Sequence, residues 1–272
     1  MITSSFKQFF LLLIATLLTH TSYTQKNALY IEPRQDNNEN VNPYNYDNKI
    51  FVPGKTYLYD YFIVKGNDTL KYKITPMPDG SKSWAYVPKE NADSSTVVFL
   101  GIKTLPKKGP IMMDKPDYDQ TEIFLYHYNI ALKPLDTELT GVIENKQNVW
   151  LHPFRFHALQ ILQLAPFPYA KLNLPRGQTY RWDLAIGKHW PEFRALEWKG
   201  RINMKCNYTI GENTEVEVPY GKVSCTEIRA EGVTREGTGR LLAYFNEQLG
   251  FVKLVYNNLD GSVIVISLKE VR

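Results

Sequence analysis

The sequence lacks the motifs that assemble reactive groups in common enzyme families. It contains no GxSxG nucleophile elbow, no HExxH zinc motif, no Walker loop and no GxGxxG after a candidate strand. Gly237 and Gly239 lie close together, but no helical pattern follows them, so a phosphate-binding loop has no support. We therefore expect a non-enzymatic protein with no catalytic residues and no cofactor.

Cysteine is equally scarce, with two residues in 272, Cys206 and Cys225. They do not form a CxxC motif, so neither a redox centre nor a zinc site is indicated. Two interpretations stay open. A disulfide between them would stabilise the fold by about 3 kcal/mol in the chain-entropy model. The alternative is a pair of buried free thiols that pack as small apolar side chains.

An excess of charge of one sign is also missing. The formal net charge is +4, from 32 Lys and Arg against 28 Asp and Glu. Residues 25–150 carry 15 basic and 16 acidic residues, and residues 151–272 carry 16 and 12, so neither half is strongly basic. A nucleic acid is therefore a poor candidate for a partner.

No apolar run is long enough for a transmembrane helix, which needs about 20 residues. The longest, residues 9–18, follows Lys7 and precedes polar residues, which is the pattern of a secretory signal peptide. Ser22 and Thr24 suit the −3 and −1 positions, so we expect cleavage before about Gln25. The mature chain is then expected to be soluble, and periplasmic or secreted.

An asparagine-rich stretch follows the expected signal peptide. Six of residues 33–49 are Asn, two are Pro, and apolar residues are few. We expect residues 25–50 to form an extended linker or surface loop, and residues 51–272 to form one β-rich domain. A domain boundary near residues 145–176 stays open.

From residue 51 onward the sequence predicts strand after strand. Alternation of apolar and polar residues over residues 70–74 and 202–210, with short Gly-, Asn- and Asp-rich turns between segments, is typical of antiparallel strands. Residues 198–210 and 214–218 are expected as separate strands around a turn at 211–213. Residues 156–164 are either a short helix or a bent strand. We expect an all-β fold: a large antiparallel meander forming a sandwich or a curved, partly closed sheet.

Two groups of residues resemble uncharacterised secreted proteins of Bacteroidota-type bacteria. The first group is residues 152–155, 164–168 and 182–187; the second is residues 244–246, 249–254, 256–257 and 260–262. The last 100 or so residues are also similar to the C-terminal sheet of a periplasmic β-rich family of unknown function. The resemblance covers about residues 150–272; it implies a secreted β-fold and supplies no catalytic residues.

Residues 150–200 concentrate the unusual side chains. Aromatic rings beside Arg and His can form a groove for a glycan or an amphipathic ligand. The candidate ligand-binding residues are Trp150, His152, Arg155, His157, Tyr180, Trp182, Trp190 and Trp198. The alternative is that these rings belong to the core of a β-protein and that the chain is a structural or interaction module.

Two other kinds of site have weaker signals. Asp183 and Glu192 could serve as the paired carboxylates of a glycan hydrolase, although a sequence cannot give their separation. His152 and His157 are five residues apart around Pro153, a spacing that places them together on neither a helix face nor a strand face. We therefore expect no metal site.

Overall fold

The structure is a computed structural model that describes residues 48–106, 109–110, 120–187 and 198–272. The chain divides into two units, Met1–Ile31 and Glu32–Arg272, and all described residues belong to the second. The expected signal peptide and most of the expected linker lie outside the described residues.

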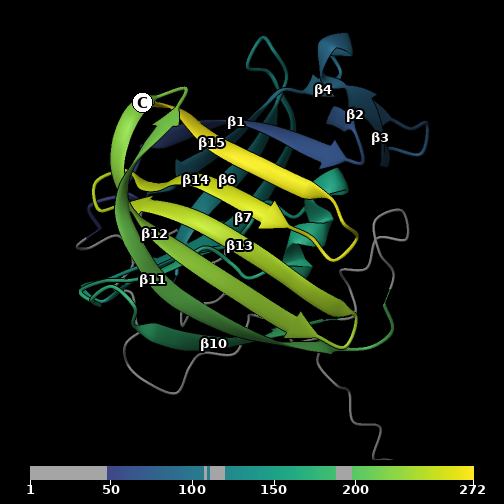
Figure 1. The fold of residues 1–272 in the computed structure, drawn as a ribbon. Helices are drawn as coiled ribbons and strands as arrows, with labels where there is room; N and C mark the ends of the chain where they lie inside the picture. Colours follow the sequence, from purple (N-terminus) through teal and green to yellow (C-terminus); the bar gives the residue numbers. More distant parts are fainter. Residues whose placement is uncertain (1–47, 107–108, 111–119, 188–197) are drawn as a thin grey trace, which may run out of the picture. The chain divides into compact units, whose positions relative to one another are not determined.

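Within the described residues, fifteen strands form one antiparallel sheet (Figure 1). The strands are β1 (Thr56–Lys65), β2 (Asp68–Pro76), β3 (Lys82–Pro88), β4 (Thr96–Val97), β5 (Phe99–Thr104), β6 (Thr121–Tyr128), β7 (Pro134–Glu144), β8 (Asn148–Leu151), β9 (Tyr169–Lys171), β10 (Thr179–Ile186), β11 (Ile202–Val218), β12 (Gly221–Thr234), β13 (Gly237–Asn246), β14 (Gly250–Asn257) and β15 (Val263–Val271). Two short 3-10 helices, η2 (Lys89–Asn91) and η3 (His157–Leu164), complete the described elements.

The strand order is β10-β11-β12-β13-β14-β15-β1-β5-β6-β7-β8-β9, with β2 paired to β1, β3 and β4 beside this path. Neighbours in sequence are mostly neighbours in the sheet because tight turns connect antiparallel strands. The expectation of an all-β antiparallel meander is confirmed. Of the two architectures left open, the structure shows a single curved sheet.

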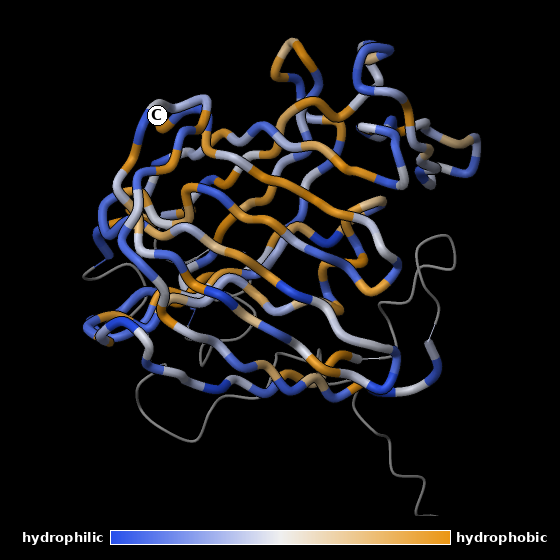
Figure 2. Tube along the Cα trace, viewed as in Figure 1, coloured by the Kyte–Doolittle hydropathy of each residue, from blue (hydrophilic) through white to orange (hydrophobic). Residues whose placement is uncertain are grey.

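Alternation of side chains explains why one face of the sheet holds the core. Along β11, Met204, Cys206 and Tyr208 are buried, whereas Lys205 and Asn207 between them are exposed. Figure 2 shows the same alternation of hydrophobic and hydrophilic residues along the neighbouring strands. A strand with this period buries one face and leaves the other face to solvent.

β11 differs from the sequence expectation. Residues 211–213 are not a turn between two strands but a β-bulge within one strand of 17 residues. The register shifts between Ile210 and Asn213, and Figure 1 shows β11 and β12 bending strongly along their length. A bulge adds local twist and lets the strand bend. At the tip of this long hairpin, the backbone N–H of Tyr220 donates to the carbonyl of Leu268 on β15, at 3.0 Å.

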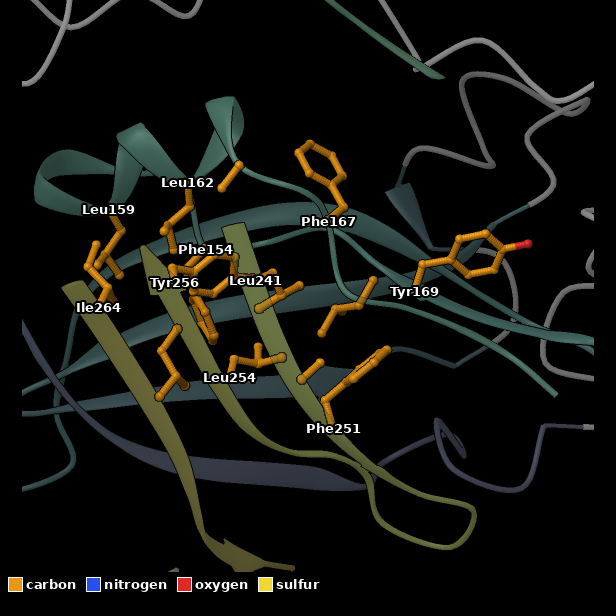
Figure 3. Packing of buried hydrophobic residues seen from close by; sticks show 14 of the residues in the cluster. Phe154, Leu159, Leu162, Phe167, Tyr169, Leu241, Phe251, Leu254, Tyr256 and Ile264 are labelled. Atoms are coloured by element: carbon orange, nitrogen blue, oxygen red, sulfur yellow. The ribbon is translucent and has the colours of Figure 1, made fainter. Parts of the chain in front are cut away.

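Residues 152–168, which connect β8 to β9, lie on the buried face of the sheet; we call them the inner segment. η3 forms its middle part, so the helix alternative for residues 156–164 is confirmed, as a 3-10 helix. Figure 3 shows Leu159 and Leu162 of η3 directed toward Tyr256 and Ile264 on β14 and β15. Both leucines are fully buried. The inner segment therefore supplies much of the core.

Two glycines let the backbone of the inner segment approach the sheet. Gly232 on β12 pairs with Gly239 on β13. A Cβ atom on Gly239 would lie 2.9 Å from the carbonyl oxygen of Leu164, and one on Gly232 would lie 2.7 Å from Sδ of Met204. Side chains at these two positions would occupy the space that the inner segment and Met204 fill.

A carboxylate holds the start of the described chain. Glu144, at the end of β7, accepts hydrogen bonds from the backbone N–H groups of Lys49 (2.6 Å), Ile50 (2.9 Å) and Phe51 (2.8 Å). Ile50 and Phe51 are buried in the core. The last residues of the expected linker are thus bound to β7.

The Gly239→Ala variant should be destabilised by roughly 1–3 kcal/mol, because the added methyl group meets backbone atoms of the inner segment that cannot move independently. Urea unfolding would measure the loss. Thr238→Ala, at the neighbouring half-buried position, is the matched control, and its free energy of unfolding should fall clearly less. Equal stability of Gly239→Ala and the wild type would show that the close approach does not constrain this position.

Candidate functional site

The predicted ligand-binding aromatics are mostly core residues. Trp150, Trp182 and Trp198 are each at most 5% exposed, and Trp190 lies outside the described residues. Trp150 on β8 stacks on Trp182 of β10, with ring centroids 5.7 Å apart. Tyr180 is partly buried, and its hydroxyl donates to the carbonyl of Tyr169 at 2.7 Å. The structure brings Trp150, Trp182 and Tyr180 together, around Tyr169, but as packed rings.

The rings of this group connect the two ends of the sheet. Tyr169 of β9 lies 5.1 Å from Trp182 of β10 and 5.5 Å from Tyr208 of β11, between ring centroids. The Tyr208 hydroxyl donates to the carbonyl of Phe167 at 2.9 Å. Among the described residues β9 pairs only with β8 and β10 only with β11, so side chains supply the contact that a strand ladder does not.

The predicted polar residues form a buried network on the inner segment. Arg155 forms an ion pair with Glu138 of β7 and donates to Oγ1 of Thr140 at 3.2 Å. Its Nη1 also lies 3.1 Å from Nδ1 of His152, which is buried against Trp150. Burial of an ion pair is costly unless hydrogen bonds compensate for the lost water. Here Nε, Nη1 and Nη2 of Arg155 each have a partner, in Glu138, His152 and Thr140 respectively. These contacts hold the inner segment on β7.

His157 belongs to a second polar group at the start of η3. Its Nε2 lies 2.6 Å from Oδ2 of Asp136, and Lys82 Nζ lies 2.7 Å from the other carboxylate oxygen. Burial alone would raise the pKa of Asp136, but the hydrogen bonds from His157 and Lys82 hold that pKa well below its usual value. The group therefore contains a carboxylate that stays ionised.

His127 of β6 lies beside this group and is fully buried. Its Nδ1 shares a short hydrogen bond with the Tyr72 hydroxyl, and its ring centroid is 6.1 Å from that of His157. Burial, reinforced by the charge of His157, lowers the pKa of His127 to about 3. The imidazole is therefore neutral in the folded protein at neutral pH.

His127 makes folding pH-dependent. Its folded pKa of about 3 lies below the unfolded value of 6.5. Its contribution to the free energy of unfolding is therefore complete above pH 6.5 and is lost as the pH falls from 6.5 toward 3. Over this range, the free energy of unfolding of the wild type should fall by up to about 1.4 kcal/mol more per pH unit than that of His127→Gln. The glutamine keeps a polar partner for Tyr72 but does not titrate. Urea unfolding at several pH values would measure this, and parallel curves would contradict it.

The two cysteines are free and buried, so the disulfide alternative is not realised. Cys206 pairs with Gly232 across the ladder, seven residues along β12 from Cys225. That spacing is roughly 20 Å at strand rise, far beyond the reach of a disulfide. Burial raises the pKa of Cys206 to about 12 and that of Cys225 to about 11, which leaves both as unreactive thiols.

A thiol assay on protein denatured without reductant should find two thiols per chain, because neither cysteine has a partner within reach. The native protein should react slowly, since both side chains are buried. The matched control is the same assay after reduction, which should give an unchanged count. A count of zero before reduction would contradict the free-thiol assignment.

A cavity of about 410 Å³ lies where the bend of β11 and β12 meets the loop after β9; we call it the end cavity. Its floor consists of buried apolar side chains on four strands: Ala170, Ile210, Ile228 and Phe245. Its size falls in the range of small-molecule sites.

Polar residues form the rim of the end cavity. Arg176, from the loop, forms an ion pair with Glu212 of the bulge, and Thr226 donates to Oδ1 of Asn213 at 2.9 Å. Lys171 and Glu247 complete the charged part of the lining. An apolar floor below a rim that carries both signs of charge suits a ligand with an apolar body and a neutral or zwitterionic polar end.

The sequence interpretation missed the residues that line the end cavity because it assigned residues 211–213 to an ordinary turn. A Gly within a pattern that otherwise continues as strand is a known signal of a bulge, and bulges often lie beside functional sites. Of the eight predicted ligand-binding residues, the seven that the structure describes do not line the end cavity.

The remaining predicted features contribute little chemistry. Asp183 is exposed on β10 and accepts two hydrogen bonds of 2.8 Å from Arg181, and Glu192 lies outside the described residues. In the described part of the chain, no three or more His, Cys, Asp and Glu side chains group as metal ligands. Within the same residues, no helix has the length and apolar character needed to cross a membrane.

Comparisons with known proteins give distant likenesses. No family model and no curated protein matches the sequence. Among solved structures, a candidate lipoprotein from Parabacteroides distasonis aligns with a TM-score of 0.47 and 8% identity, over 82% of this chain and 97% of that one. A candidate exported protein with a YmcC-like fold from Bacteroides fragilis gives 0.45 and 10% over the same shares.

A third solved structure, the hypothetical lipoprotein YmcC from Escherichia coli, aligns with a TM-score of 0.32 and 9% identity, over 82% of this chain and 89% of that one. All three TM-scores lie below 0.5, so these likenesses carry no argument about this chain.

Proposed function

We propose that this chain is an exported, non-enzymatic protein of the cell envelope that binds an amphipathic ligand in the end cavity. Export rests on the signal-like pattern of residues 1–24. The ligand-binding role rests on one observation: a cavity of about 410 Å³ with an apolar floor and a polar rim. The ligand's apolar part would contact Ile210, Ile228 and Phe245, and its polar end would lie at the rim.

The charges of the rim narrow the kind of ligand. Arg176 and Glu212 neutralise one another, and Lys171 is balanced in sign by Glu247. A strongly charged ligand would therefore be repelled by as many rim charges as attract it. A sugar-headed or other neutral amphiphile avoids this repulsion, and its hydroxyl groups can hydrogen-bond to Asn213 and Thr226.

A second candidate function is a structural or interaction module without a small-molecule site. The burial of Trp150, Trp182 and Trp198 favours it, because rings that form the core are not available to a ligand. The end cavity favours the binding function, so occupancy of this cavity separates the two.

Octyl glucoside, below its micelle concentration, is a suitable probe because it combines an apolar chain with a neutral sugar. Calorimetric titration should show saturable binding to the wild type. Ile228→Phe, which fills the floor, and Asn213→Trp, which narrows the mouth, should each weaken binding at least tenfold, or about 1.4 kcal/mol.

The matched control is Val233→Trp, which adds the same ring at an exposed position of β12 outside the end cavity. It should bind octyl glucoside as the wild type does. Unchanged affinity in both cavity variants, or no saturable binding to the wild type, would favour the interaction module instead.

A further inference from the structure

The outer face of β5 and β6 carries a row of aromatic rings that the core does not use. Leu100, Ile102 and Leu125 point inward and are buried, so the residues between them point outward. The outward residues include four partly exposed rings, Phe99, Phe124, Tyr126 and Tyr128, which we call the outer aromatic patch. None of them lines the end cavity.

The register of the two strands brings these rings together. Phe99 pairs with Tyr128, and Gly101 pairs with Tyr126. The rings of Tyr126 and Tyr128 are nearly parallel, at 14°, with centroids 5.1 Å apart, and Phe124 lies 5.7 Å from Tyr126. The patch is therefore continuous over two neighbouring strands.

Gly101 shapes the patch. A Cβ atom at this position would lie 2.5 Å from Cε2 of Tyr128, so the ring of Tyr128 rests directly over the glycine. A larger residue would displace this ring outward. The absence of a side chain at Gly101 thus keeps the ring close to the sheet.

Two lysines lie beside the outer aromatic patch. Lys269 Nζ lies 5.4 Å from the centroid of Phe99, and Lys103, which pairs with Phe124 across the ladder, is exposed. Within the part of the chain that the structure describes, neither lysine has an ion-pair partner. Of the acids near the patch, Glu122 on β6 is fully buried, Asp60 lies 2.8 Å from Lys71, and Glu270 binds Arg272. The patch consequently has an excess of positive charge.

We infer that the outer aromatic patch binds an acidic polysaccharide, as a second site independent of the end cavity. The C–H face of a pyranose ring packs on an aromatic ring, and the tyrosine hydroxyls can hydrogen-bond to sugar hydroxyls. Lys103 and Lys269 supply the charge that pairs with carboxylates on the polymer. A nucleic acid fits less well, because phosphates at every nucleotide require a larger basic surface than two unpaired lysines provide.

Affinity electrophoresis of the full chain through gels containing polygalacturonate tests this inference. The wild type should be retarded, and Tyr126→Ala should weaken the retardation at least about fivefold, since base or sugar stacking on one ring contributes on the order of 1 kcal/mol. Lys269→Ala should weaken it by a similar factor and should reduce its dependence on salt. Tyr126 is chosen because Tyr128 covers Gly101 and its loss threatens the fold.

Two matched controls carry the same changes away from the patch. Tyr220→Ala removes a 45% exposed tyrosine at the β11–β12 turn, and Lys222→Ala removes a lysine beside it; both should migrate as the wild type does. Asn213→Trp at the end cavity should also leave retardation unchanged. A loss of retardation in Asn213→Trp would overturn the independence of the two sites.

Neutral dextran and single-stranded oligo-dT complete the test. Equal retardation by dextran would overturn the role of the lysines, and stronger retardation by oligo-dT would identify a nucleic acid as the partner instead. No retardation of the wild type by polygalacturonate would overturn the inference, as would equal retardation of Tyr126→Ala and the wild type. If Tyr126→Ala melts at a lower temperature than the wild type, Lys269→Ala decides the test: reduced retardation supports the inference, and unchanged retardation overturns it.

Discussion

Packing of aromatic rings between the two ends of one curved sheet is the interaction on which the rest of the structure depends. β9 and β10 stand at the ends of the strand order, and Tyr169, Trp150 and Trp182 bring them together through ring contacts. With the ends in contact, the concave face encloses the inner segment. If β9 and β10 were hydrogen-bonded to one another, the two strands would lie about 5 Å apart. Contact through side chains leaves room for the loop after β9.

That loop and the bend of β11 together create the end cavity. The bulge at residues 211–213 changes the direction of β11, and the loop residues Leu172–Arg176 follow directly after β9. Both elements are thus consequences of how the sheet bends and where its ends meet. The outer aromatic patch depends instead on the middle of the sheet, where β5 and β6 present alternate residues to solvent.

Much of the fold can be predicted from local patterns, because strand alternation and turn residues each occupy a few consecutive positions in the sequence. The C-terminal meander was predicted in this way, and so was a short helix at residues 156–164 as one of two alternatives, which the structure shows to be a 3-10 helix. The bulge in β11 was missed because Gly-Glu-Asn is also good turn chemistry, and only pairing with β12 distinguishes the two. The cysteine pairing could not be settled for the same reason: register, not separation in sequence, decides whether two thiols meet.

The candidate site was harder to predict than the fold. The tryptophans of residues 150–200 are rare and clustered, but rarity does not distinguish a packed ring from an accessible one. The rings of Phe124, Tyr126 and Tyr128 are common residues in an ordinary strand pattern. Their accessibility becomes visible only when inward and outward positions of β6 are assigned.

The three hydrogen bonds that Glu144 accepts from the backbone N–H groups of residues 49–51 also affect how the domain responds to mechanical load. Tension applied through the chain before Asn48 would act first on these bonds and on the buried Ile50 and Phe51 rather than on the ladder of β1. The three bonds share that load because they converge on one carboxylate. The β1 ladder, whose pairs run from Tyr57 onward against β15, is thereby shielded from a pull that would otherwise open it one pair at a time.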